Sequence, residues 1–160
     1  MLRAQRRPRL TTQYSVTRQI QAPIELVFER ISDVRQFKDV NEDIVEIEFL
    51  TLQQSGVGTR FRETRNMNGR RATTTLELTE YVENEHVRFV SDAGGAIWDT
   101  VMRVSKKDGI TELAMTMDAR PHKLLARIVM PLIKGMVTKA VVADMDKLKA
   151  WCEREADRSD

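Results

Sequence analysis

Apolar and polar residues alternate along the first patterned segment of the chain. Residues 14–20 place a large side chain at every second position, and this period of two predicts a half-buried strand. Pro23 follows, and proline favours the first turn of a helix because it presets φ. Apolar residues then recur at helical spacing over 24–31, which predicts a short helix. We expect one further turn over 34–37.

The pattern changes to strand-like segments between residues 44 and 119. The expected strands are 44–52, 59–67, 73–81, 87–91, 96–104 and 111–119. No helical pattern between them is long enough to connect parallel strands, so an antiparallel meander is expected. Asn68-Gly69 is the preferred pair for a type I′ hairpin because both positions adopt positive φ. Gly94-Gly95 and the segment ending at Gly109 are further turn signals.

A helical period begins after Pro121 and continues almost to the last residue. Its apolar stripe consists of Ile133, Val137, Ala140, Val141, Met145, Leu148 and Cys152. Pro131 and Gly135 are expected to kink this helix or to separate 124–130 from it. The sequence therefore predicts one α+β domain over 13–154, in which a seven-stranded antiparallel curved sheet wraps around a long C-terminal helix. A basic arm without fixed structure (1–12) and a polar tail (155–160) flank it.

Charge and cysteine content narrow the class of protein. The chain has 26 Lys and Arg against 24 Asp and Glu, and four of the arginines lie in the first ten residues without an acid. This arm is either a solvated tail or a transient contact with an anionic membrane surface or RNA. The body is not basic, so specific nucleic-acid binding is not expected. The single cysteine, Cys152, excludes an intramolecular disulfide and favours a cytoplasmic location.

Several local motifs resemble one family. They are residues 20–28, Asp33, Gly56-Val-Gly-Thr59, residues 79–83, residues 109–113 and residues 144–149. In this order they resemble the START and birch-pollen-allergen-like (SRPBCC) superfamily, specifically its polyketide cyclase/dehydrase-like branch. The resemblance implies the helix-grip fold, with a cavity for lipids, polyketides or other apolar ligands between the sheet and the long helix. It implies neither a reaction nor a cofactor, and no cofactor is expected.

The candidate cavity residues follow from strand parity and helix spacing. They are Phe37, Phe61, Leu76, Leu78, Phe89, Trp98, Thr100, Met102, Leu113, Met115, Met117, Met130, Ile133, Met136, Val137 and Ala140. Methionines from three elements predict a wall that adapts to varied apolar ligands. The alternative is that these methionines simply fill an ordinary core. A shift of one residue in any strand would reverse its assignments.

Few residues are candidates for chemistry. Glu63 and Arg65 share the parity of Phe61, so this pair either enters the cavity or faces solvent on the curved sheet. Glu63, Asp99 and Thr100 are the candidates for moving protons in a cyclase- or dehydratase-like enzyme. The two histidines, His86 and His122, lie in unrelated segments, and no metal site is expected.

Three classes of function remain open. The first is binding or transport of a hydrophobic small molecule in an internal cavity. The second is a polyketide cyclase- or dehydratase-like enzyme that uses the same cavity. The third is a protein-interaction module that uses the arginine-rich arm or an exposed apolar patch.

Overall fold

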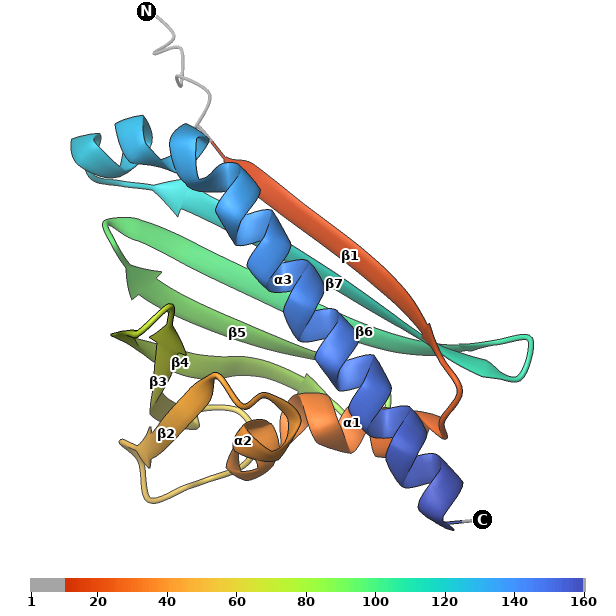
Figure 1. The fold of residues 1–160 in the computed structure, drawn as a ribbon. Coiled ribbons are helices and arrows are strands. Elements are labelled where there is room, and N and C mark those ends of the chain that lie inside the picture. Colours follow the sequence, from red (N-terminus) through yellow and green to blue (C-terminus); the bar gives the residue numbers. More distant parts are fainter. Residues whose placement is uncertain (1–10, 160) are drawn as a thin grey trace, which may run out of the picture.

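Seven antiparallel strands form one sheet in the computed structural model, which describes residues 11–159 (Figure 1). The strands are β1 (Thr12–Ile20), β2 (Ile44–Phe49), β3 (Arg60–Met67), β4 (Arg70–Val82), β5 (His86–Ala93), β6 (Ala96–Lys107) and β7 (Ile110–Pro121). Their order in the sheet is β1-β7-β6-β5-β4-β3-β2. Consecutive strands from β2 to β7 are neighbours, which confirms the predicted meander. β1 joins it at the far edge by pairing with β7.

Tight turns make several strands longer than the sequence predicts. Asn68 (φ 52°) and Gly69 (φ 81°) both have positive φ, as a type I′ turn requires. Asp108 and Gly109 do the same between β6 and β7. A two-residue turn adds no unpaired residues to either strand, so Met67 pairs directly with Arg70.

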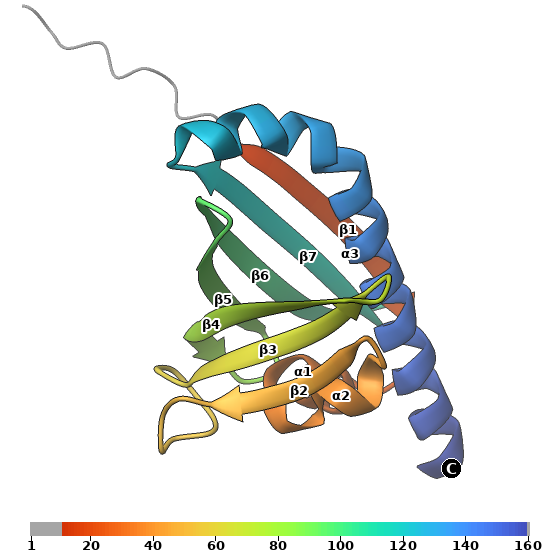
Figure 2. The ribbon, with the colours of Figure 1, turned by 60° about the vertical axis from the view of Figure 1, so that its left-hand side comes forward.

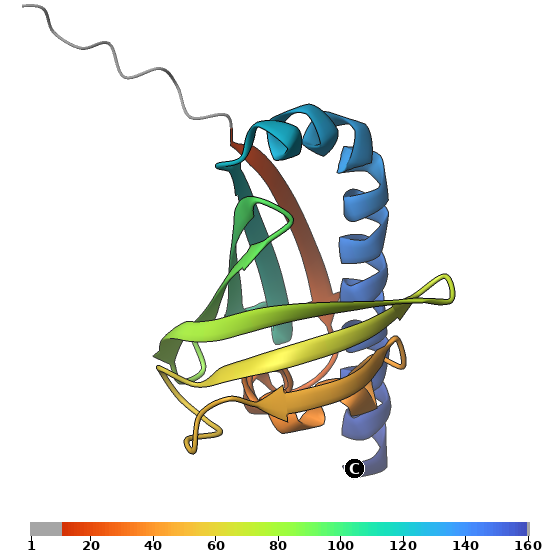
Figure 3. The ribbon, with the colours of Figure 1, turned by 90° about the vertical axis from the view of Figure 1, so that its left-hand side faces the viewer.

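Two irregularities bend the sheet. The pairing register shifts between Ile44 and Glu46 on β2, and again between Leu78 and Glu80 on β4. An extra residue on one strand bends it and increases its twist. Figures 2 and 3 show the result: β2, β3 and β4 run across the direction of β1 and β7, so the sheet forms a concave face.

Short helices close one end of this concave face. They are α1 (Ile24–Ser32), the 3-10 turn η1 (Val34–Gln36) and α2 (Phe37–Val40). Asp33 separates α1 from η1, and its side chain accepts a hydrogen bond from the Arg35 backbone N–H. The predicted single turn over 34–37 is therefore two turns that extend to Val40.

The C-terminal helix α3 (Leu124–Ser159) is continuous over 36 residues and contains Pro131. Its first turns lie across the end of β1 and β7, after which it changes direction and runs along the concave face (Figures 2 and 3). The predicted kink is present, because proline removes a backbone donor and clashes with the preceding turn, but 124–130 is not a separate helix. Within residues 11–159, no helix is both long and apolar enough to cross a bilayer.

The two predicted ends of the domain, residues 13 and 154, lie within regular elements of the structure. Residues 1–10 of the predicted basic arm lie outside the described residues, and Thr12, also assigned to that arm, already belongs to β1. Residues 155–159, assigned to a polar tail, continue α3.

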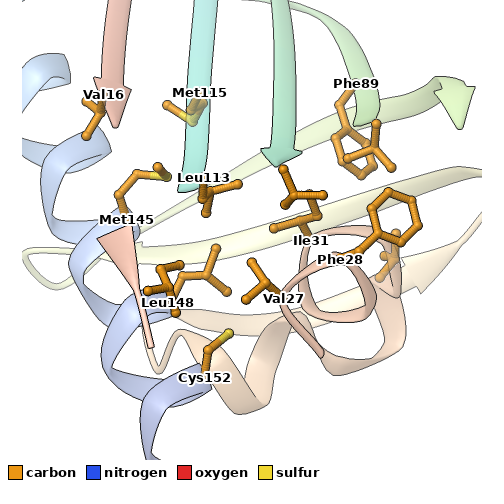
Figure 4. Close-up of a cluster of buried hydrophobic side chains, with 14 of the residues drawn as sticks. Val16, Val27, Phe28, Ile31, Phe89, Leu113, Met115, Met145, Leu148 and Cys152 are labelled. Atoms are coloured by element: carbon orange, nitrogen blue, oxygen red, sulfur yellow. The ribbon is translucent and has the colours of Figure 1, made fainter. Parts of the chain in front are cut away.

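The main core lies where α1, β7 and the second half of α3 meet (Figure 4). Val27, Leu113 and Cys152 are fully buried there. A second, smaller cluster lies under the first turns of α3 and consists of Tyr14, Ala96, Ala119 and Met130. The two clusters fix α3 to the sheet at both of its halves.

Candidate ligand-binding cavity

A cavity of about 530 Å³ lies between the concave face, α3 and the short helices. Of the residues that the sequence predicts for a cavity, its lining includes Phe37, Leu76, Phe89, Trp98, Thr100, Met102, Met115, Met117, Met136, Val137 and Ala140. The methionines come from β6, β7 and α3, as parity and spacing predict. The lining also includes Met67, Met145, Ile31, Val40, Ile44, Val141 and Leu148. The sequence did not single these out as cavity residues, although Val141, Met145 and Leu148 lie on the predicted apolar stripe of the helix.

Five predicted lining residues lie outside the cavity. Phe61, Leu78 and Leu113 face inward but are fully buried in the main core. Phe61 is enclosed by other rings, with centroids 6.1 Å from those of Phe37 and Phe89. The other two are on α3: Met130 packs in the smaller cluster, and Ile133 is half-buried and is not part of the lining. Parity predicts the direction in which a side chain points but not whether another side chain covers it.

The apolar wall is held in place by its neighbours. Trp98 Nε1 donates a hydrogen bond to the Ala93 carbonyl at 3.1 Å, and the indole stacks on the Tyr14 ring with centroids 6.5 Å apart. The Tyr14 hydroxyl is buried and has no partner among the described residues. Burial raises the pKa of this phenol above its usual value. The wall around Trp98 is therefore rigid and apolar, with small hydroxyls at Thr74, Ser91 and Thr100.

Glu63, Arg65 and Asp144 form a charged cluster on one side of the cavity. Arg65 Nε donates to Glu63 Oε1, and Arg65 Nη1 donates to Asp144 Oδ2 at 2.6 Å. The Glu63 side chain is only 10% exposed. The sequence left open whether the Glu63–Arg65 pair faces solvent, and the structure places both residues in the cavity lining. The sequence did not indicate Asp144, although Ala140 lies one helical turn earlier on the same face.

Electrostatics fix the charge state of Arg65. Burial lowers the pKa of this guanidinium, but the carboxylates of Glu63 and Asp144 outweigh it, and the pKa is raised above its ordinary value. Arg65 therefore stays charged at any physiological pH and cannot act as a base. With both carboxylates ionised, the cluster carries one negative charge in excess.

A hydrogen-bond network extends this cluster to the segment that precedes β2. Asn41 is buried, and its Nδ2 donates to Asp144 Oδ1 at 2.7 Å. Lys147 Nζ donates to Asn41 Oδ1 at 3.0 Å and to Asp43 Oδ2 at 2.6 Å. Side chains from β3, α3 and the end of α2 are thus connected, which holds α3 at a fixed distance across the cavity.

Arg30, on α1, is a further charged residue in the lining, and the sequence did not indicate it. It is 8% exposed, and its Nε and Nη1 atoms are buried without a partner among the described residues. Its Nη2 donates to Glu29 Oε1 at 3.0 Å, and the guanidinium lies over the Trp151 ring at 4.4 Å. Buried donors without acceptors cost about 1–3 kcal/mol each, and more when charged. Arg30 therefore keeps two unused hydrogen-bond donors in a residue that lines the α1 end of the cavity.

Asp99 is not part of the cavity, which corrects its selection as a catalytic candidate. Its side chain accepts two hydrogen bonds from Arg88 at 2.7 Å and one from Arg120 at 3.0 Å. These hydrogen bonds, with Arg88 contributing most, lower the pKa of Asp99 below its usual value although burial opposes them. Trp98 and Thr100 line the cavity, so strand alternation turns Asp99 to the opposite, convex face.

The remaining reactive residue types do not form a site. His86 lies beside Glu80 and Glu85 at 3.1 Å, and His122 lies 2.8 Å from Asp92. No group of three or more His, Cys, Asp and Glu within residues 11–159 is arranged to hold a metal ion. Burial raises the pKa of the Cys152 thiol to about 12, which keeps it protonated and unreactive.

Comparisons with known proteins support the fold described above. No curated protein matches the chain in sequence. Among solved structures, it is similar to TTHA0849 from Thermus thermophilus (TM-score 0.71, 18% identity, 87% of this chain and 95% of that one). It is also similar to norcoclaurine synthase from Thalictrum flavum (TM-score 0.70, 16% identity, 91% and 96%).

The di-domain ARO/CYC protein StfQ from the steffimycin biosynthetic pathway gives a TM-score of 0.77 at 8% identity. The match covers 92% of this chain and 52% of StfQ, so the chain spans about half the length of that protein. At these identities the similarity shows the fold, and it confirms the helix-grip architecture. A family model described as polyketide cyclase / dehydrase and lipid transport matches residues 11–153. The chain therefore belongs to this family of the SRPBCC superfamily, as its sequence motifs predict.

Proposed function

We propose that the protein binds a hydrophobic small molecule, such as a lipid or a polyketide-like metabolite, in the cavity under α3. The observation that supports this most directly is a cavity of about 530 Å³ whose wall consists mainly of Met, Trp, Phe and aliphatic side chains. Pockets that hold small molecules have volumes of about 300–1,000 Å³ and combine apolar walls with a few polar groups. Flexible thioether side chains suit ligands of varied shape.

The polar lining narrows the chemistry of this ligand. Arg65 is already paired with Glu63 and Asp144, whereas Arg30 keeps two buried donors without acceptors among the described residues. A ligand with an apolar body and one acceptor group, such as a carboxylate or a carbonyl, would supply what Arg30 lacks. We propose that such a group lies at the α1 end of the cavity.

Filling the cavity tests the binding proposal. Ala140 lines the cavity, whereas Ala143 is exposed on the same helix. We expect Ala140→Phe to weaken the binding of a fluorescent fatty acid at least tenfold, and Ala143→Phe to leave it unchanged. Fluorescence titration measures the affinity, and native mass spectrometry of protein from cells detects a bound ligand. Equal affinities of the two variants, or no ligand in any screen, would contradict the proposal.

Arg30→Met tests the chemistry of the ligand, because methionine keeps much of the length and removes the charge. The unchanged protein is expected to prefer a fluorescent fatty acid over its methyl ester, and Arg30→Met is expected to lose this preference. A thermal unfolding curve of the variant checks that the fold is intact. If the preference survives in a folded variant, Arg30 does not contact the ligand.

A cyclase- or dehydratase-like activity is the second candidate, because Glu63 and Thr100 both line the cavity. Glu63 is held by Arg65 close to any ligand and can accept a proton from it. Glu63→Gln keeps the shape of the side chain and removes the base. Loss of turnover of a polyketide-like substrate with unchanged affinity would favour an enzyme, whereas binding without turnover in the unchanged protein would favour a binding protein.

A further inference from the structure

The first half of α3 exposes an unusual amount of apolar surface. Leu124, Leu125, Ile128, Leu132 and Met136 are between 57% and 80% exposed. They lie within four turns of one helix. Large aliphatic side chains gathered in one exposed segment are rare on soluble proteins unless the surface meets a partner. We call this segment, 123–139, the apolar basic face.

The charged residues of the apolar basic face are all positive. Lys123, Arg127, Lys134 and Lys139 are exposed, and none of them forms an ion pair with a described residue. The sequence contains no Asp or Glu between Asp118 and Asp144. The face therefore combines exposed leucines with four unneutralised cations.

The face adjoins the cavity. Met136 belongs to both, and Val137 and Ala140 follow it in the cavity lining. Figures 2 and 3 show the first turns of α3 at the end of the molecule where β1 begins, away from α1 and α2. Thr12 pairs with Ala119 at this end. The four arginines of residues 1–10 therefore precede, in the sequence, a strand that begins beside the apolar basic face.

We propose that the apolar basic face docks on an anionic lipid bilayer. Helices that lie in a membrane interface combine apolar side chains, which enter the headgroup boundary, with Lys and Arg, which contact acidic lipids. A second copy of the chain is a poorer occupant, because pairing two such faces would oppose four cations with four cations and no carboxylate. Docking here brings the Met136 side of the cavity to the membrane surface. The proposal stands whether or not the cavity holds a ligand.

Vesicle sedimentation of the full chain tests the docking. The probes are vesicles of phosphatidylcholine alone and of phosphatidylcholine with phosphatidylglycerol. We expect clear binding to the anionic vesicles, weak binding to the neutral ones, and release by added salt. Equal binding to both, or binding to neither, would overturn the proposal.

Two sets of variants locate the contact. Leu125→Ser combined with Leu132→Ser, and separately Lys123→Glu combined with Lys134→Glu, are each expected to reduce binding about tenfold or more. The matched controls are Leu52→Ser, an exposed leucine outside the face, and Arg70→Glu, an exposed cation on β4. Both controls are expected to bind as the unchanged protein does. All substituted residues are exposed, so the unfolding midpoints should not change.

Two further outcomes would assign the apolar basic face, or the vesicle contact, a different role. Analytical ultracentrifugation that shows a dimer in the unchanged protein and a monomer in the leucine variant would assign the face to a second copy. Loss of vesicle binding on deletion of residues 1–10, with both face variants still binding, would assign the contact to the arm alone. Either result overturns the proposal.

Discussion

Leu113 and Met117 lie on the same strand and point to the same side of the sheet, yet their surroundings differ. Leu113 is fully buried in the main core between α1 and the second half of α3. Met117, further along β7, lines the cavity, whose α3 wall runs from Met136 to Leu148 in the middle of the helix. One end of the space between sheet and helix is therefore packed and the other is hollow. The packed end supplies stability by burial, which allows the hollow end to remain unfilled.

At the hollow end, an ion cluster lies on the convex face of the sheet. On the convex face behind Trp98 and Thr100, Asp99 binds Arg88 of β5 and Arg120 of β7. This ion cluster connects three adjacent strands at the level of the cavity. These polar contacts join the back of the sheet where its front lines the cavity.

The largest effect that distinguishes the two ends is expected from truncation on β7. Leu113→Ala leaves a void in a packed core and should lower the free energy of unfolding by about 3 kcal/mol. Met117→Ala only enlarges a space that already exists, so its cost should be about 1 kcal/mol or less. Urea unfolding at an unchanged m-value measures both. Equal losses would show that the two ends are packed alike.

An intermediate effect is expected from Asp99→Asn. Removing one partner of a buried ion pair costs about 3–5 kcal/mol, and we expect about 2 kcal/mol because Arg88 and Arg120 are a third exposed and can be hydrated. The exposed Asp157 provides the control substitution Asp157→Asn, which should have no effect.

The free energy of unfolding of Asp99→Asn is also expected to depend less on pH than that of the unchanged protein. The folded pKa of Asp99 is lowered, so its stabilisation is complete above the unfolded pKa of about 3.9 and is lost as the pH falls through the lower, folded value. Unfolding free energies measured from about pH 6 downward should decline below about pH 4 in the unchanged protein. The decline should be smaller in Asp99→Asn. An identical decline would show that Asp99 does not carry this stabilisation.

The smallest effect on stability is expected from Ala140→Cys, which compares the two ends by thiol reactivity instead. Cys152, in the packed end, has a pKa of about 12 because of burial, so its alkylation at about pH 8 should be about a thousandfold slower than that of an ordinary thiol. Ala140→Cys places a second thiol in the hollow end, and this one should react readily. Mass spectrometry after timed alkylation counts the modified thiols. Fast modification of both would mean that α3 detaches from the packed end.

The sequence predicted the fold from local signals that tertiary contacts did not override. Asn68-Gly69 specified a hairpin, and strand parity placed Trp98, Met115 and Met117 on the concave face. Parity could not predict depth, which is why Phe61 and Leu113 were assigned to the cavity and lie in the core. Strand parity did indicate that Asp99 lies outside the cavity, because its neighbours Trp98 and Thr100 were both predicted to point inward.

The polar part of the cavity was harder to predict, because its members meet over long sequence distances. Arg65 and Asp144 are 79 positions apart, and only the path of α3 across the sheet brings them together. Arg30 lies on a short helix whose amphipathic pattern favours a solvent position for a charged residue. No periodic signal shows that Trp151 of α3 covers its guanidinium.

The pairing of the first strand with the last determines when the chain can complete its fold. Gln19 Nε2 donates to Glu112, 93 positions later, whereas each strand from β2 to β6 pairs with the strand next in sequence. During synthesis the hairpins can therefore form as they leave the ribosome, while β1 has no partner until β7 has emerged. Contacts between distant segments slow folding, and unpaired strand edges expose the chain to aggregation. Of the seven strands, β1 is thus synthesised before the others but is among the last elements to be secured.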